Sequence, residues 1–135
     1  MKTTLFVAGL FFISFSVFSQ QPASLSTQDF AKAVQTGKVQ VLDVRTADEY
    51  KSGHLDKAMQ ANWLDGKEFN DRTSHLDKKI PVYIYCLSGG RSGAAAEALR
   101  AKGYMVTNMD GGINAWKRNK QPLIGVDANI KQTST

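Results

Sequence analysis

Apolar residues along this chain gather in short blocks of two kinds, and the two kinds alternate. Blocks rich in β-branched and aromatic residues predict strands at residues 39–44, 82–85 and 106–108, and a short apolar block predicts another around residues 58–62. Segments between them have helical spacing or a helix-forming composition and predict helices at residues 26–36, 46–52, 67–77, 92–102 and 113–116. Strands that alternate with helices favour an α/β fold in which helices cover both faces of a parallel sheet.

Capping signals mark the starts of two predicted helices. Ser26 precedes the first helix and Gly37 follows its end. Thr46 and Glu49 stand three residues apart at the start of the second helix, which is the spacing of a capping box. We therefore interpret Glu49 as the capping partner of Thr46 rather than as a catalytic acid or base.

The first nineteen residues differ in kind from the rest of the chain. Lys2 is followed by an apolar run from Leu5 to Phe18, and residues 17–19 suit a signal peptidase. This run is shorter than the roughly 20 apolar residues of a membrane span, which favours a secretory signal peptide over a retained anchor. We expect residues 1–19 to be removed, with no stable membrane insertion afterwards, and the protein to be periplasmic or secreted.

The rest of the chain has the length of one compact domain. We expect this domain at residues 24–122, followed by a polar tail at residues 123–135. The 17 basic and 12 acidic residues give a net charge of +5, but the basic residues are scattered. The tightest cluster, residues 117–120, lies at a predicted helix end, where cations complement the helix dipole. Without a basic stripe or an aromatic-plus-basic motif, nucleic-acid binding is not expected.

The single cysteine lies on a glycine-containing loop between a predicted strand and a predicted helix. The loop reads Cys86-Leu87-Ser88-Gly89-Gly90-Arg91-Ser92. Backbone N–H groups at a helix start lack helical partners, so they and the helix dipole stabilise a thiolate placed there. A lone cysteine at a strand end is commonly an inert buried residue. The two glycines and the arginine instead favour an anion cradle and a nucleophilic Cys86.

Other polar and aromatic residues have simpler structural interpretations. Asp43 and Arg45 lie near a strand end and could support the substrate pocket, but an ion pair or a loop hydrogen bond is the favoured role. Trp63 and Trp116 are assigned to packing. One cysteine and two histidines match no metal-ligand spacing, so no metal site is expected.

Three separated motifs together resemble the single-domain rhodanese family, over about residues 24–122. The first is Leu42-Asp43-Val44-Arg45-Thr46, followed by Glu49-Tyr50, Gly53-His54-Leu55 and Ala58. The second is the Cys86–Ser92 loop. The third is Gly103-Tyr104, followed by Asp110-Gly111-Gly112 and Ala115-Trp116. The resemblance implies a rhodanese-like α/β fold with a central, mostly parallel sheet of about five strands.

The same resemblance implies sulfurtransferase chemistry at Cys86, with no metal or organic cofactor. The thiolate would attack the outer sulfur of a donor such as thiosulfate or polysulfide, and the Cys86 persulfide would pass that sulfur to cyanide or a thiol. The implied substrate-binding residues are Leu87, Ser88, Gly89, Gly90, Arg91 and Ser92, most of them acting through backbone N–H groups. Arg91 would either clamp an anionic donor or brace the loop through a carboxylate. The place of His54 in the first motif implies packing and hydrogen bonding rather than a general base.

Several alternatives stay open at this stage. Family members with a stronger thiosulfate preference place extra basic residues in the loop, where this chain has Leu87 and Gly90, so polysulfide or a protein persulfide is equally compatible. A phosphatase or arsenate reductase would need five residues between cysteine and arginine, whereas Cys86 and Arg91 are separated by four. A sulfur carrier or a rhodanese-like binding module would retain the same cysteine. The sequence identifies no protein partner.

Overall fold

The computed structural model describes residues 2–4, 9, 13 and 20–125, and at its centre lies a five-stranded sheet. The strand order is β1-β5-β4-β2-β3, and all neighbouring pairs are parallel. In chain order, the elements are β1 (Ser24–Leu25), α1 (Thr27–Gln35), β2 (Gln40–Asp43), α2 (Ala47–Lys51), β3 (Met59–Gln60), α3 (Gly66–Thr73), β4 (Val82–Tyr85), α4 (Gly90–Ala101), β5 (Val106–Met109) and α5 (Gly112–Arg118). The predicted α/β fold with a parallel five-stranded sheet is confirmed.

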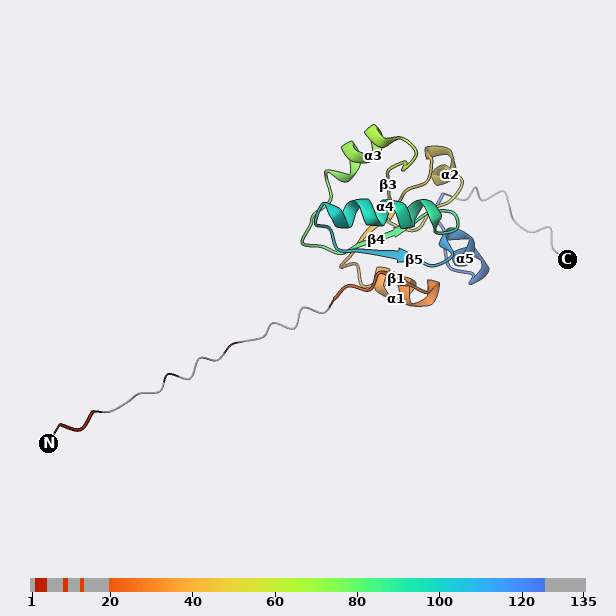
Figure 1. The fold of residues 1–135 in the computed structure, drawn as a ribbon. Coiled ribbons are helices and arrows are strands. Elements are labelled where there is room, and N and C mark those ends of the chain that lie inside the picture. The colour runs from red at the N-terminus through yellow and green to blue at the C-terminus, as the bar shows by residue number, and fades with distance from the viewer. Residues whose placement is uncertain (1, 5–8, 10–12, 14–19, 126–135) are drawn as a thin grey trace.

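Helices α3 and α4 cover one face of the sheet. Leu42, Val82 and Ile84 point to this face, where they are buried with Phe69 of α3 and Leu99 of α4. Figure 1 shows both helices above β4 and β5, and α1 below these strands.

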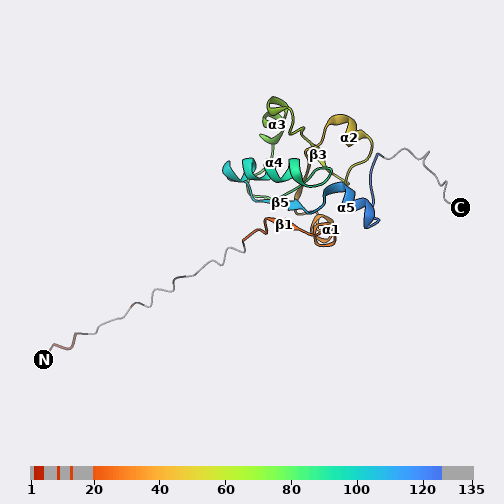
Figure 2. The same ribbon diagram turned by 45° about the vertical axis from the view of Figure 1, so that its right-hand side comes forward.

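Helices α1 and α5 cover the opposite face. The side chains of Val41, Tyr83 and Tyr85, which alternate along their strands with those of the first face, pack there against Phe30 of α1 and Trp116 of α5. Figure 2, turned by 45°, keeps α4 on one side of the sheet and α1 on the other. Because both faces are covered, the central strand β4 is buried along its whole length, as its apolar sequence indicates.

Several element boundaries differ from the predicted ones. Helix α4 begins at Gly90 rather than at Ser92, because Gly89 has a left-handed φ of 110° and its carbonyl already accepts the N–H of Gly93. Helix α3 ends at Thr73 rather than at Asp77. Beyond Thr73 the chain tightens into turns that place Leu76 against the core.

The two-residue strand β1 was not predicted. Its residues Ser24 and Leu25 pair with Asn108 and Met109 of β5 at the edge of the sheet. Two residues are too few to display the alternating pattern from which a strand is inferred.

Parts of the predicted terminal segments lie outside the described residues. Of the predicted signal peptide at residues 1–19, only residues 2–4, 9 and 13 are described, and the predicted tail is described up to residue 125. Among the residues that the structure describes, no helix has the length and apolar composition needed to cross a bilayer.

Candidate active site

Cys86 is the first residue after β4, at the carboxyl edge of the sheet. Its Sγ accepts a hydrogen bond from the backbone N–H of Gly89 at 3.1 Å and another from the hydroxyl of Ser92 at 3.2 Å. The positive φ of Gly89 turns the chain so that its N–H faces back to the sulfur while α4 begins at the next residue. The loop thus closes around the thiol in the way that its glycines predict.

The hydrogen-bond donors around Cys86 favour its thiolate form. Burial raises the pKa of the thiol, but hydrogen bonds from the Ser92 hydroxyl and from the backbone N–H groups of Ser92, Gly89 and Ser88 outweigh burial and lower the pKa below its ordinary value. A thiol whose pKa is lowered by amides at a helix start is more often ionised near neutral pH, and the thiolate is the nucleophilic form.

The sulfur lies at the base of the loop rather than on its surface. Cys86 is only 1% exposed, whereas Leu87 is 41% exposed and Ser88 and Gly90 are also exposed. A reactant therefore has to reach the sulfur past the exposed residues of the loop.

The start of α5 fixes the other side of the loop. The N–H of Ile113 donates to the carbonyl of Cys86 at 2.9 Å, and the N–H of Asn114 donates to the carbonyl of Leu87 at 3.1 Å. Gly112 touches the loop so closely that a Cβ atom there would lie 2.6 Å from the carbonyl oxygens of Cys86 and Leu87. The start of α5 thus holds the backbone of the loop in place through two of its carbonyls.

Arg91 is tied to a carboxylate of α2. Its Nη1 and Nη2 atoms donate to the two oxygens of Glu49 at 2.7 and 2.9 Å. The hydrogen bonds from Arg91, with a smaller contribution from Thr46, lower the pKa of Glu49 to about 2 although burial opposes this shift. Of the two roles considered for Arg91, this contact is the one that a brace through a carboxylate requires.

Glu49 also makes the capping box that its spacing predicts. Its Oε1 accepts the N–H and the hydroxyl of Thr46, while Thr46 Oγ1 accepts the N–H of Glu49. The link to Arg91 was missed in the sequence, because the two residues are 42 positions apart and only the fold brings them together.

Asp43 and Arg45 form a buried polar network behind the loop. Arg45 Nη2 donates to Asp43 at 2.6 Å and to the carbonyl of Gly53 at 2.7 Å, and the Tyr85 hydroxyl donates to Asp43 at 2.7 Å. The favoured ion pair is therefore present. Among the described residues, no hydrogen bond joins this network to Cys86, so it supports the edge of the sheet rather than the sulfur.

The remaining candidates have packing roles. The His54 ring stacks on Tyr50 at a centroid distance of 3.7 Å, and its Nδ1 lies 2.9 Å from the Tyr50 carbonyl oxygen. Trp116 is buried against α1, and Trp63 contacts Phe69 edge to face. Within the described part of the chain, no group of three or more His, Cys, Asp or Glu residues is placed to hold a metal ion.

The arrangement of loop, cysteine and arginine agrees with a comparison against protein families. The family model of the rhodanese-like domain matches residues 26–119. The chain belongs to this family.

Relatives within the rhodanese-like family differ in their described roles. A sulfurtransferase of Allochromatium vinosum is 36% identical over 94 residues, which cover 69% of this chain and 85% of the relative. A tRNA uridine(34) hydroxylase of Chlamydia abortus is 32% identical over 104 residues, but the match spans only 32% of that longer protein. A crystal structure of a rhodanese-related protein from Thermoplasma volcanium has a TM-score of 0.68 at 24% identity. The match covers 76% of this chain and 97% of the Thermoplasma chain, and at this identity it supports the fold alone.

Proposed function

We propose that this rhodanese-like protein is an exported sulfurtransferase that carries sulfur as a persulfide on Cys86. The donor is a sulfane-sulfur compound such as thiosulfate or polysulfide, and the acceptor is a thiol or cyanide. The relationship to the Allochromatium sulfurtransferase supports this class of reaction. The apolar run that follows Lys2 supports export.

The reaction has two displacement steps. The Cys86 thiolate forms an S–S bond with the outer sulfur of the donor, the bond between that sulfur and the rest of the donor breaks, and sulfite or a shortened polysulfide leaves with the bonding electron pair. An acceptor thiolate or cyanide then attacks the terminal sulfur of the persulfide, and the Cys86 thiolate is the leaving group. A sulfur with a lowered pKa is suited to both steps, because it is ionised as a nucleophile and is a good leaving group.

One observation carries the proposal. The Cys86 sulfur accepts hydrogen bonds from the Gly89 N–H at 3.1 Å and the Ser92 hydroxyl at 3.2 Å, so donors surround the atom that is negatively charged before and after transfer. An inert packing cysteine has no need of these donors.

Substitution of the nucleophile tests the proposal. We expect Cys86→Ser to keep the fold, because serine is nearly isosteric, and to lose sulfur loading entirely. Mass spectrometry after incubation with polysulfide should show one added sulfur atom on the wild-type chain and none on the variant. Loading of the Cys86→Ser protein would contradict the assignment of the nucleophile.

A second readout distinguishes an enzyme from a carrier. Wild-type protein supplied with excess donor and cyanide should form thiocyanate over many turnovers. A single loading event without repeated release would show a sulfur carrier and would overturn the enzymatic part of the proposal.

A further inference from the structure

The loop around Cys86 contains one charged side chain, and that charge is already paired. From Cys86 to Ser92, Arg91 is the only ionisable residue besides the cysteine. Both of its terminal nitrogens are held by the two Glu49 oxygens in a bidentate pair. The side chains are only 22% and 30% exposed, so this pair is better shielded from solvent than an ordinary surface ion pair.

The Glu49 carboxylate is itself held in place. Its Oε1 accepts both the N–H and the hydroxyl of Thr46 within the capping box of α2. A carboxylate fixed from both sides does not swing away readily to leave Arg91 free for a substrate. Glu49 therefore holds the Arg91 guanidinium in place.

Among the described residues, the cation that the loop itself supplies is already paired. Glu49, the Cys86 thiolate and Asp43 are the charged groups that act on the Arg91 guanidinium. Asp43 is already paired with Arg45. With Arg91 neutralised by Glu49, a doubly charged donor such as thiosulfate would approach the thiolate without a compensating charge from the loop itself.

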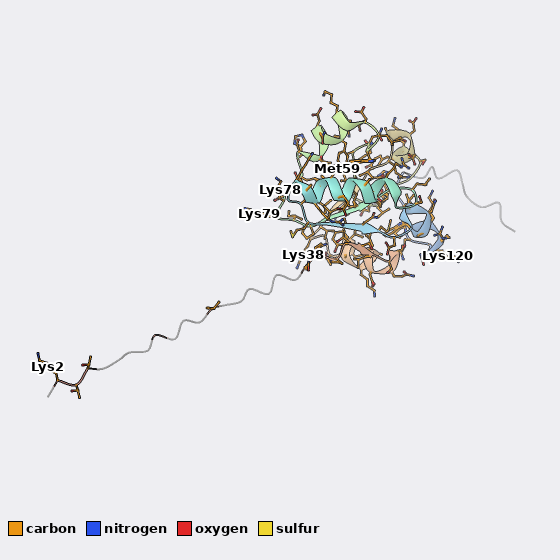
Figure 3. The ribbon with its side chains drawn as sticks, viewed as in Figure 1. Lys2, Lys38, Met59, Lys78, Lys79 and Lys120 are labelled. Atoms are coloured by element: carbon orange, nitrogen blue, oxygen red, sulfur yellow. The ribbon has the colours of Figure 1, made fainter. Side chains whose placement is uncertain are left out.

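Three lysines lie too far along the sheet to replace Arg91, whereas Arg118 of α5 lies nearer, beside Gly111. Lys38 precedes β2, and Lys78 and Lys79 precede β4, so all three lie at the edge where strands begin, opposite the Cys86 loop. Figure 3 shows these three lysines together on the side of the domain away from α5. Leu87, the exposed residue next to Cys86, offers apolar surface instead.

We propose that Glu49 is a specificity-determining residue, which withholds Arg91 from the substrate and so selects alkyl persulfides over thiosulfate as sulfur donors. This inference rests on the proposed sulfur transfer at Cys86. In the selected reaction the Cys86 thiolate bonds to the outer sulfur of R–S–SH, the S–S bond of the donor breaks, and R–S⁻ leaves with the electron pair. Cys86 is then a persulfide that carries the donor's proton, and charge is conserved.

The test compares two donors on wild-type protein and the Glu49→Gln variant. Glutamine has no charge to hold Arg91, yet it is compatible with a capping box, so α2 keeps its start. The rate at which Cys86 gains one sulfur is measured by mass spectrometry with thiosulfate and, separately, with cysteine persulfide. We expect the variant to load from thiosulfate about tenfold faster, since a charge-assisted hydrogen bond from freed Arg91 becomes available to the donor. Loading from cysteine persulfide should change less than about threefold.

Two further variants show whether the gain acts through Arg91. Asp48→Asn removes the same charge from the first turn of α2 at an exposed position and should leave both rates unchanged. Glu49→Gln combined with Arg91→Ala should lose the gain for thiosulfate. If Glu49→Gln does not fold, Glu49→Asp, whose shorter side chain reaches Arg91 less well, should give a smaller gain in the same direction.

The outcomes separate this inference from the proposed function. Wild-type protein that loads from thiosulfate as fast as from cysteine persulfide, or a Glu49→Gln variant with no gain, would overturn the role of Glu49 while leaving sulfur transfer intact. A gain that persists without Arg91 would also overturn it. Wild-type protein that loads from neither of these donors nor from polysulfide would remove the proposed function itself, and the inference with it.

Discussion

At the scale of single residues, the reactivity of Cys86 depends on its nearest hydrogen-bond donors. Ser92 contributes twice, through its hydroxyl at 3.2 Å from Sγ and through its backbone N–H. The residue is fully buried on the first turns of α4, so its hydroxyl is held toward the sulfur rather than toward water. Removing the Ser92 hydroxyl should therefore have a measurable effect on the pKa of the Cys86 thiol.

We predict that Ser92→Ala raises the pKa of the Cys86 thiol. Loading is fast above the pKa and slows as the pH falls through it, so a raised pKa shifts this decline to higher pH. At mildly acidic pH, the variant should load sulfur about tenfold more slowly than wild type. The measurement is the pH profile of loading from polysulfide.

Ser88→Ala is the matched control for this variant. Ser88 is exposed on the same loop, and it acts on the sulfur through its backbone N–H, which alanine retains. The pH profile of sulfur loading by Ser88→Ala should coincide with the wild-type profile. If both serine variants shift the profile equally, the specific role of the Ser92 hydroxyl is wrong.

At the scale of elements, the active-site loop is held between two helix starts. Helix α4 supplies N–H groups to the sulfur, and α5 binds the loop carbonyls through Ile113 and Asn114. Only glycine allows this contact at position 112. The backbone there has a positive φ of 57°, and the loop lies so close that a Cβ atom would collide with it. The geometry of the cradle is thus set partly by a helix outside the Cys86 motif.

We predict that Gly112→Ala displaces the loop and weakens the cradle. An added Cβ would collide with backbone atoms that cannot move without shifting Cys86 and Leu87. The variant should be destabilised by about 2–4 kcal/mol, and the pKa of its Cys86 thiol should rise. Chemical denaturation measures the first effect, and the pH profile of sulfur loading measures the second.

Gly37→Ala separates backbone strain from the contact with the loop. Gly37 has a similar positive φ of 69°, but an added Cβ there would meet no atom within 4 Å. This control should lose about 1–2 kcal/mol of stability and keep the wild-type pH profile. A Gly112→Ala profile no different from that of Gly37→Ala would show that α5 does not position the loop.

At the scale of the whole molecule, sequence patterns predict what is local and miss what the sheet order brings together. The fold class, the Cys86 loop and the Thr46–Glu49 capping box follow from spacing and composition within short windows. The ion pair between Glu49 and Arg91 does not, because it depends on the placement of β2 beside β4, which sets α2 next to the loop.

The contact of Gly112 with the loop was missed for the same reason. The Gly111-Gly112 pair indicates a turn into a helix, but nothing in its own sequence shows that the carbonyls of Cys86 and Leu87 lie against it. An adjacent pair of glycines at a helix start was the available signal. It predicts a tight backbone approach without identifying the partner.

The most direct test is a titration of the Cys86 thiol in the otherwise unmodified protein. Thiolate absorbance is followed as pH is lowered, and the signal of the Cys86→Ser variant is subtracted, so that no bulky reagent has to reach the buried sulfur. The arrangement of donors around Sγ predicts a midpoint below the ordinary cysteine value of about 8.5. A midpoint at or above that value would contradict the claim that the loop stabilises a reactive thiolate.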